Sequence, residues 1–140
     1  MDLKTAIENL TVYAPNPTDF CILNQTVDLG DREAFESVLR DWASRFGHSL
    51  VPLDARNPCT RLSAGEVIEH IGSHLSRDIV FNTRGFDESE SRAMAELLVN
   101  SFGFTDGVAI NFVIRDWTFC DLLVCTGQNF TAVIAVLGED

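Results

Sequence analysis

Positive charge is scarce in this sequence. The 140-residue chain contains one lysine, Lys4, and nine arginines, whereas aspartate and glutamate together number 21. The formal net charge is therefore −11 at pH 7. A field of this sign repels phosphate groups, and we therefore expect no direct binding to nucleic acid and no binding to an anionic membrane. The same field attracts basic protein surfaces, which makes a basic macromolecular partner the first expectation.

Several chemical signatures are missing as well. The four cysteines form no C-x-x-C pair, which argues against a zinc knuckle or a thioredoxin-type motif, and we expect free thiols that are mostly buried. Neither a glycine-rich phosphate-binding loop nor the G-x-S-x-G of serine hydrolases occurs. These absences leave enzyme activity open but favour a binding protein that needs no cofactor.

Long apolar runs are also absent. Residues 131–137 make up one of the longest apolar stretches, and this is far short of the roughly 20 residues that a membrane span needs. The first residues do not show a basic stretch followed by an apolar run, which is the pattern of a secretory signal. We therefore expect a cytoplasmic protein.

Hydrophobic periodicity and capping residues divide the chain into helices and strands. The expected helices cover residues 2–10, a segment that starts at Asp28 or Asp31 and ends at Phe46, a segment that starts at Ser63, and residues 87–102. The expected strands cover residues 20–27, 50–53, 79–81, 108–114, 119–125 and 130–137. Short turns join the last three strands, including a two-residue turn at Gly127 and Gln128, which predicts a three-stranded antiparallel meander. The predicted fold is one α+β domain over residues 1–140, with about four helices packed on a mainly antiparallel sheet.

The last predicted strand is apolar on both faces. Thr131 is the only polar residue among residues 130–137. An antiparallel strand with one face in water should alternate between polar and apolar residues. This strand must therefore lie inside the sheet with both faces covered, or its exposed face must be buried in a homodimer.

Two acidic helices form the preferred candidate surface for a basic partner. The candidate partner-binding residues are Asp31, Glu33, Glu36, Asp41 and Trp42 on the second helix, Asp87, Glu88 and Glu90 on the fourth, and Trp117 between two strands. Trp42, Trp117 and Phe104 are candidate apolar anchors. Immunity proteins, phage-encoded inhibitors and secretion chaperones share this size and charge, so we expect a protein that neutralises or regulates its partner.

The alternative site is the segment of residues 55–85, where four arginines outnumber three carboxylates. Its candidate ligand-binding residues are Arg56, Arg61, His70, His74, Arg77 and Arg84, which suit an anionic small molecule such as a nucleotide. Glu66, His70 and His74 recur at every fourth residue and therefore align along one helix. This spacing offers ligands for one transition metal, in a sequestering module or a small metal-dependent enzyme.

Overall fold

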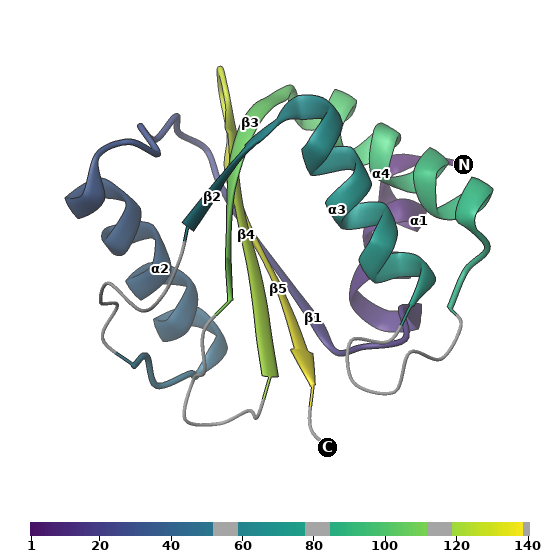
Figure 1. Cartoon of the computed structure of the whole chain (residues 1–140), viewed down its shortest axis with the longest axis horizontal. Coiled ribbons are helices and arrows are strands. Elements are labelled where there is room, and N and C mark those ends of the chain that lie inside the picture. The colour runs from purple at the N-terminus through teal and green to yellow at the C-terminus, as the bar shows by residue number, and fades with distance from the viewer. Residues whose placement is uncertain (52–58, 78–84, 112–118, 139–140) are drawn as a thin grey trace.

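The structure is a computed structural model that describes residues 1–51, 59–77, 85–111 and 119–138. Five strands in this part of the chain form one antiparallel sheet in the order β1-β5-β4-β3-β2 (Figure 1). The strands are β1 (Thr18–Leu23), β2 (Cys59–Ser63), β3 (Phe104–Asn111), β4 (Phe119–Gly127) and β5 (Thr131–Gly138). Strands β3, β4 and β5 follow one another as neighbours, so the predicted α+β fold with a C-terminal meander is confirmed.

Helices cover both faces of this sheet. On one face lies α2 (Arg32–Phe46). On the other lie α1 (Leu3–Glu8) with the π-helical turn η1 (Asn9–Tyr13), α3 (Ala64–Ser76) and α4 (Glu88–Phe102) (Figure 1). The layers are therefore helix, sheet and helices. Within the described residues, no helix is both long and apolar enough to cross a membrane.

The helices begin and end at the residues that their sequence favours. Asp31 caps α2 by accepting hydrogen bonds from the backbone amides of the next turn, and Asp87 caps α4 in the same way. Ser63 and Glu66 form a capping box at the start of α3. Gly47 and Gly103 close α2 and α4 with φ values of 72° and 68°, a left-handed conformation that glycine adopts without steric cost.

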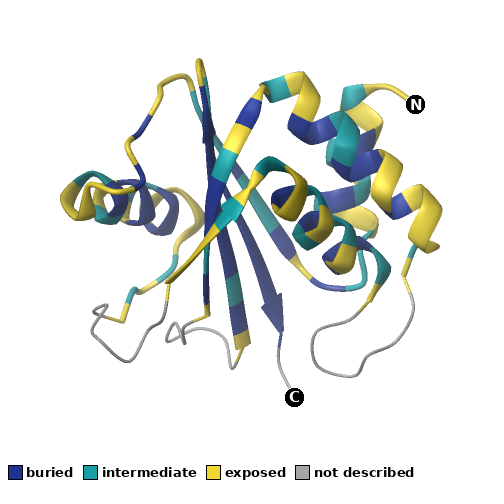
Figure 2. Cartoon of the chain, turned by 45° about the horizontal axis from the view of Figure 1, so that its top comes forward, coloured by how far each residue is buried: buried dark blue, intermediate teal, exposed yellow. Residues whose placement is uncertain are grey.

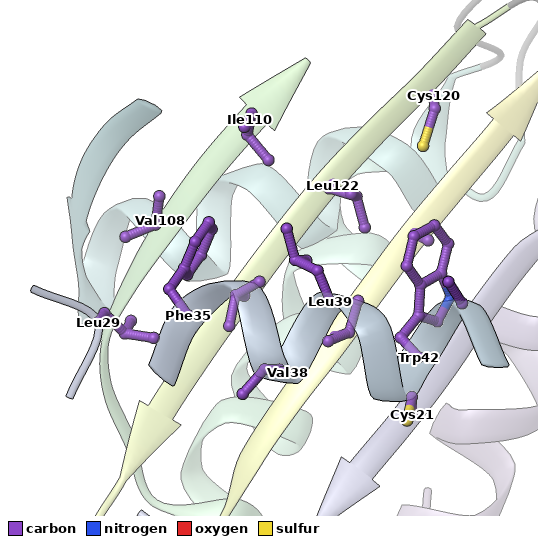
Figure 3. Packing of buried hydrophobic residues seen from close by; sticks show 14 of the residues in the cluster. Cys21, Leu29, Phe35, Val38, Leu39, Trp42, Val108, Ile110, Cys120 and Leu122 are labelled. Atoms are coloured by element: carbon purple, nitrogen blue, oxygen red, sulfur yellow. The ribbon is translucent and has the colours of Figure 1, made fainter. Parts of the chain in front are cut away.

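The sheet separates two hydrophobic cores. On β4, Leu122 packs in the core beneath α2 (Figure 3). Val124 packs in the same core, whereas Leu123 packs in the core beneath the other helices. Cys120 and Cys125 also lie in different cores, so they point to opposite faces of the sheet. Burial is concentrated along the strands and on the inward sides of the helices (Figure 2).

The position of β5 answers the question that its sequence raised. It pairs with β1 on one side and β4 on the other, and all eight of its residues are buried. The strand is thus central and covered on both faces within one chain. Burial within one chain therefore explains the apolar residues on both faces of β5, and a homodimer is not needed to cover them.

Several predicted boundaries need correction. The first strand, predicted over residues 20–27, is β1 and covers Thr18–Leu23. Of the strand predicted over residues 50–53, residues 50 and 51 are not in a strand, and residues 52 and 53 lie outside the described residues. Strand β2 forms the edge of the sheet next to β3, because β3 is its only neighbour in the strand order. Gly127 still belongs to β4, so Gln128 and Asn129 form the hairpin loop. The strand predicted over residues 79–81 lies outside the described residues.

Candidate functional site

A carboxylate lies on the inner side of a central strand. Asp121 is on β4 between Asn111 of β3 and Val136 of β5, and alternation along the strand directs it to the same face as Leu123 and Cys125. That face is covered by α3. An ionised side chain in such a place needs partners, because transfer of a charge from water into a protein interior is costly.

Two histidines of α3 supply these partners. His74 Nε2 lies 2.8 Å from Asp121 Oδ2, and His70 Nε2 lies 3.5 Å from Asp121 Oδ1. The two rings are one helical turn apart, with centroids separated by 4.9 Å and planes at 76°. The His74 side chain is 9% exposed, whereas those of His70 and Asp121 are 23% and 21% exposed. The cluster is therefore partly open to solvent on one side.

The electrostatics of this cluster favour an ionised carboxylate. Burial alone would raise the pKa of Asp121, but contacts with His70 and His74 outweigh burial and hold that pKa well below its usual range. The Nε2 atoms of both histidines are buried and pair with the Asp121 carboxylate, although neither contact has the geometry of a hydrogen bond. One charged acceptor thus faces two ring nitrogens at short distance. One ligand atom from each residue lies within 4.8 Å of the other two, so the three side chains can hold a metal ion.

Glu66 does not belong to this cluster, although the sequence placed it in line with the two histidines. Its Oε1 accepts a hydrogen bond from the Ser63 amide at 3.1 Å, and this contact lowers the pKa of Glu66. The structure therefore brings Asp121 to the histidines while Glu66 caps the helix. Sequence reasoning missed Asp121, and the signal for it was a lone carboxylate at an inward-facing position of an otherwise apolar strand.

The other candidate ligand residues of residues 55–85 do not share a pocket with the histidines. Arg61 forms an ion pair with Asp106 at 3.1 Å, and its register partner Val108 places it on the α2 side of the sheet. Arg77 lines a groove of about 350 Å³ between α3 and α4. Arg56 and Arg84 lie outside the described residues. The described members thus point to different surfaces, which is not the arrangement expected of one anionic-ligand site.

A larger groove lies on the α2 side of the sheet. Its volume is about 810 Å³, and we call it the α2 groove. It is lined by Ile22, Leu23, Asn24, Gln25, Thr26, Val27, Asp28, Asp31, Ala34, Ser37, Val38, Asp41 and Arg45. The groove thus combines apolar side chains with three carboxylates and one guanidinium.

The candidate anchors for a partner need correction. Trp42 is fully buried, and its indole N–H donates to Asp19 Oδ2 at 3.0 Å, so it stabilises the core instead of contacting a partner. Phe104 is only 3% exposed and is excluded for the same reason. Trp117 lies outside the described residues.

The acidic helices do not merge into one surface. Asp31, Glu33, Glu36 and Asp41 lie at the start of α2 or on it, and Asp87, Glu88 and Glu90 lie at the start of α4. These two helices cover opposite faces of the sheet (Figure 1). A partner that binds only one face of the molecule therefore contacts either the carboxylates of α2 or those of α4, not both.

Comparison with models of known protein families, with curated proteins and with solved structures found no match for this chain.

Proposed function

We propose that this protein binds a basic segment of a partner protein in the α2 groove and thereby neutralises or regulates that partner. The observation that carries the proposal is the joint presence of acidic and apolar side chains in one groove of about 810 Å³. The net charge of −11 supports it, because a negative field speeds the approach of a basic partner.

Charge complementarity favours a basic occupant. Three carboxylates, those of Asp28, Asp31 and Asp41, line the groove against one guanidinium, that of Arg45. Asp28 Oδ1 accepts a hydrogen bond from the Gly30 amide at 2.9 Å, and Asp31 caps α2, so both carboxylates are held by the backbone at the entry to the helix. Carboxylates that are already fixed lose little side-chain entropy when a guanidinium binds them.

Apolar side chains of the groove provide the second half of the recognition. Ile22 and Leu23 are half-buried, and Val27 and Val38 are buried beside them. Arginine and lysine carry long aliphatic stems that cover apolar surface while their charged ends reach polar groups. A segment that alternates basic and aliphatic residues therefore fits this lining better than a purely charged one.

The groove between α3 and α4 is a weaker candidate. Its volume is about 350 Å³, and its charged lining residues are Glu69, Glu88, Arg77 and Arg92. Two carboxylates and two guanidiniums balance one another there, so this groove offers no preference for a basic occupant.

A peptide-binding experiment tests the proposal. The probe is a short fluorescein-labelled peptide that alternates arginine with leucine, and its fluorescence anisotropy is followed at low salt. The groove variant carries Asp28→Asn and Asp41→Asn, which remove two charges with little change of shape. The matched control carries Glu88→Gln and Glu96→Gln on α4, because Glu96 forms an i,i+4 ion pair with Arg92 as Asp41 does with Arg45.

We expect the groove variant to bind the peptide about tenfold more weakly than the wild type, as rim charges of this kind contribute up to about 1 kcal/mol each. The control should bind within about twofold of the wild type, because its charges lie on the other face. Equal weakening in both variants would show that the peptide responds to net charge only and would contradict the proposal.

We also propose that the interaction takes place in the cytoplasm. None of the four cysteines forms a disulfide bond, and three of them are buried. Cysteines without disulfide bonds fit a reducing compartment.

A further inference from the structure

We propose that His70, His74 and Asp121 bind one divalent transition-metal ion, of which Zn²⁺ is the reference case. This site lies on the opposite side of the sheet from the α2 groove and is independent of the proposed peptide binding. Its residues come from two elements far apart in the sequence, helix α3 and strand β4.

The spacing of the ligand atoms suits a small ion. Zinc binds imidazole nitrogen and carboxylate oxygen at about 2.0–2.2 Å, so two ligand atoms of a tetrahedral site are about 3.3 Å apart. The two histidine-to-Asp121 distances are 2.8 Å and 3.5 Å, and they fall on either side of this value. All three ligand atoms lie within 4.8 Å of one another, so small side-chain rotations bring them around a common centre.

The contacts between the two rings and the carboxylate are the second observation. His74 Nε2 belongs to a side chain that is nine-tenths buried and is paired with Asp121, but neither this contact nor that of His70 Nε2 has the geometry of a hydrogen bond. A metal ion among these atoms would bind both nitrogens and the carboxylate at once.

A second histidine–carboxylate pair in this protein shows the contrast. His48 Nε2 lies 2.8 Å from Asp19 Oδ2, and the Trp42 indole N–H donates to the same oxygen at 3.0 Å. Two protein groups thus contact this carboxylate oxygen, and of these only the His48 imidazole can bind a metal. Among the described residues, His70, His74 and Asp121 are the only group of three such ligands that gathers in this way.

The coordination number points to an open site. Three protein ligands leave one position of a tetrahedral zinc ion for water or another small ligand, as in catalytic zinc sites, whereas structural sites have four protein ligands. The partial exposure of His70 and Asp121 gives the ion a route from solvent. Imidazole and carboxylate ligands also accept other divalent transition metals, so the set of residues selects a class of ions.

Metal titration of the purified full chain tests this proposal. The protein is first freed of metal with a chelator, and Zn²⁺ is then added in competition with a chromogenic chelator near neutral pH. Co²⁺ is titrated in parallel, because its visible absorption reports on the coordination of the ion. The ligand variants are His74→Ala, His70→Ala and Asp121→Asn, and circular dichroism checks that each one folds.

Two variants serve as controls. Glu66→Gln replaces the carboxylate that the sequence aligned with the histidines, and glutamine preserves the capping box. Cys59→Ser removes the exposed thiol, which is the most accessible alternative zinc ligand among the cysteines. We expect both to bind zinc as the wild type does.

The wild type should bind one zinc ion per chain, and each ligand variant should bind it at least about 100-fold more weakly, since even loss of an outer-shell partner costs about 10–100-fold in metal affinity. Cobalt should give visible absorption bands of a four-coordinate site in the wild type only. Zinc affinity that is equal in the wild type and the folded ligand variants, or that is lost in Cys59→Ser, would overturn the proposal. Either result leaves the peptide-binding proposal untouched, because the α2 groove contains none of these residues.

Discussion

Replacement of Trp42 by phenylalanine should destabilise the whole protein. The indole is fully buried between α2 and the sheet, where Figure 3 shows it beside strand residues of the same core. Its N–H donates to Asp19 Oδ2 at 3.0 Å, and its ring centroid lies 5.1 Å from that of His48. The sequence alone made Trp42 a candidate partner anchor, so this substitution separates a role in the core from a role at the surface.

The expected loss follows from two contributions. A hydrogen bond to a charged group contributes about 1.5–3 kcal/mol to stability. The smaller ring leaves a space in a fully buried site, which adds about 1 kcal/mol on the scale of large-to-small core substitutions. His48 remains 2.8 Å from the same carboxylate oxygen and offsets part of the first contribution, so we expect a total of about 2–4 kcal/mol.

Urea denaturation followed by far-ultraviolet circular dichroism measures this loss. In a chain of this length it corresponds to a decrease in melting temperature of roughly 6–15 °C. The control is Phe46→Leu at the last position of the same helix, where the residue is 41% exposed and the expected loss is below about 1 kcal/mol. A loss below about 1 kcal/mol for Trp42→Phe would refute the burial of this residue and restore it as a surface anchor.

Four further outcomes are expected. In the native protein a thiol reagent should modify Cys59 rapidly and the other three cysteines slowly, because these are buried and burial raises the pKa of each; a second fast thiol would contradict the core packing. Stability should fall as pH rises above 9, because unfolded cysteine (ordinary pKa 9.0) loses its proton there whereas Cys120, with its pKa raised to about 12, keeps it. Cys120→Val should reduce this dependence without abolishing it, because burial also raises the pKa of Cys21 and Cys125. Glu33→Lys with Glu36→Lys should slow association with the arginine–leucine peptide, and the effect should shrink as salt rises, whereas equal rates at all salt concentrations would argue against electrostatic steering. Ile134→Asp should unfold the chain, since β5 is buried within the sheet; a soluble wild-type dimer that this variant converts to a folded monomer would contradict that placement.

Local signals in the sequence were enough to predict most of the fold. Helix starts at Asp31, Ser63 and Asp87 depend on side chains that cap the nearest backbone amides, so a few neighbouring residues determine them. The meander was predictable because short turns join strands that pair with their neighbours in sequence. The edge strand β2 was not predicted, since its mostly exposed residues lack an apolar pattern and it forms only by pairing with β3.

Only the two histidines of the candidate metal site could be predicted from the sequence. His70 and His74 share one helix, and their spacing of four residues already places them side by side. Asp121 is 47 residues beyond His74, and only the packing of α3 on β4 brings the two together. Glu66 was the local alternative, but the backbone amide of Ser63 binds its carboxylate at the helix start.

The candidate docking surface depended on tertiary structure in a different way. The acidic residues of α2 and α4 were recognisable from the sequence, but one sequence does not reveal which sheet face each helix covers. The α2 groove joins α2 to β1 and the segment that follows β1, and this junction is what brings apolar and acidic side chains together.

The most direct test of the proposed function is a map of where a basic peptide binds. Amide chemical shifts of the isotope-labelled wild-type protein are recorded by nuclear magnetic resonance while the arginine–leucine peptide is added at low salt. We expect the largest shifts on the residues that line the α2 groove, and little shift on residues 88–96 of α4. These lining residues are residues 22–28, Asp31, Ala34, Ser37, Val38, Asp41 and Arg45. Largest shifts on α4, or small shifts spread over both faces of the sheet, would contradict it.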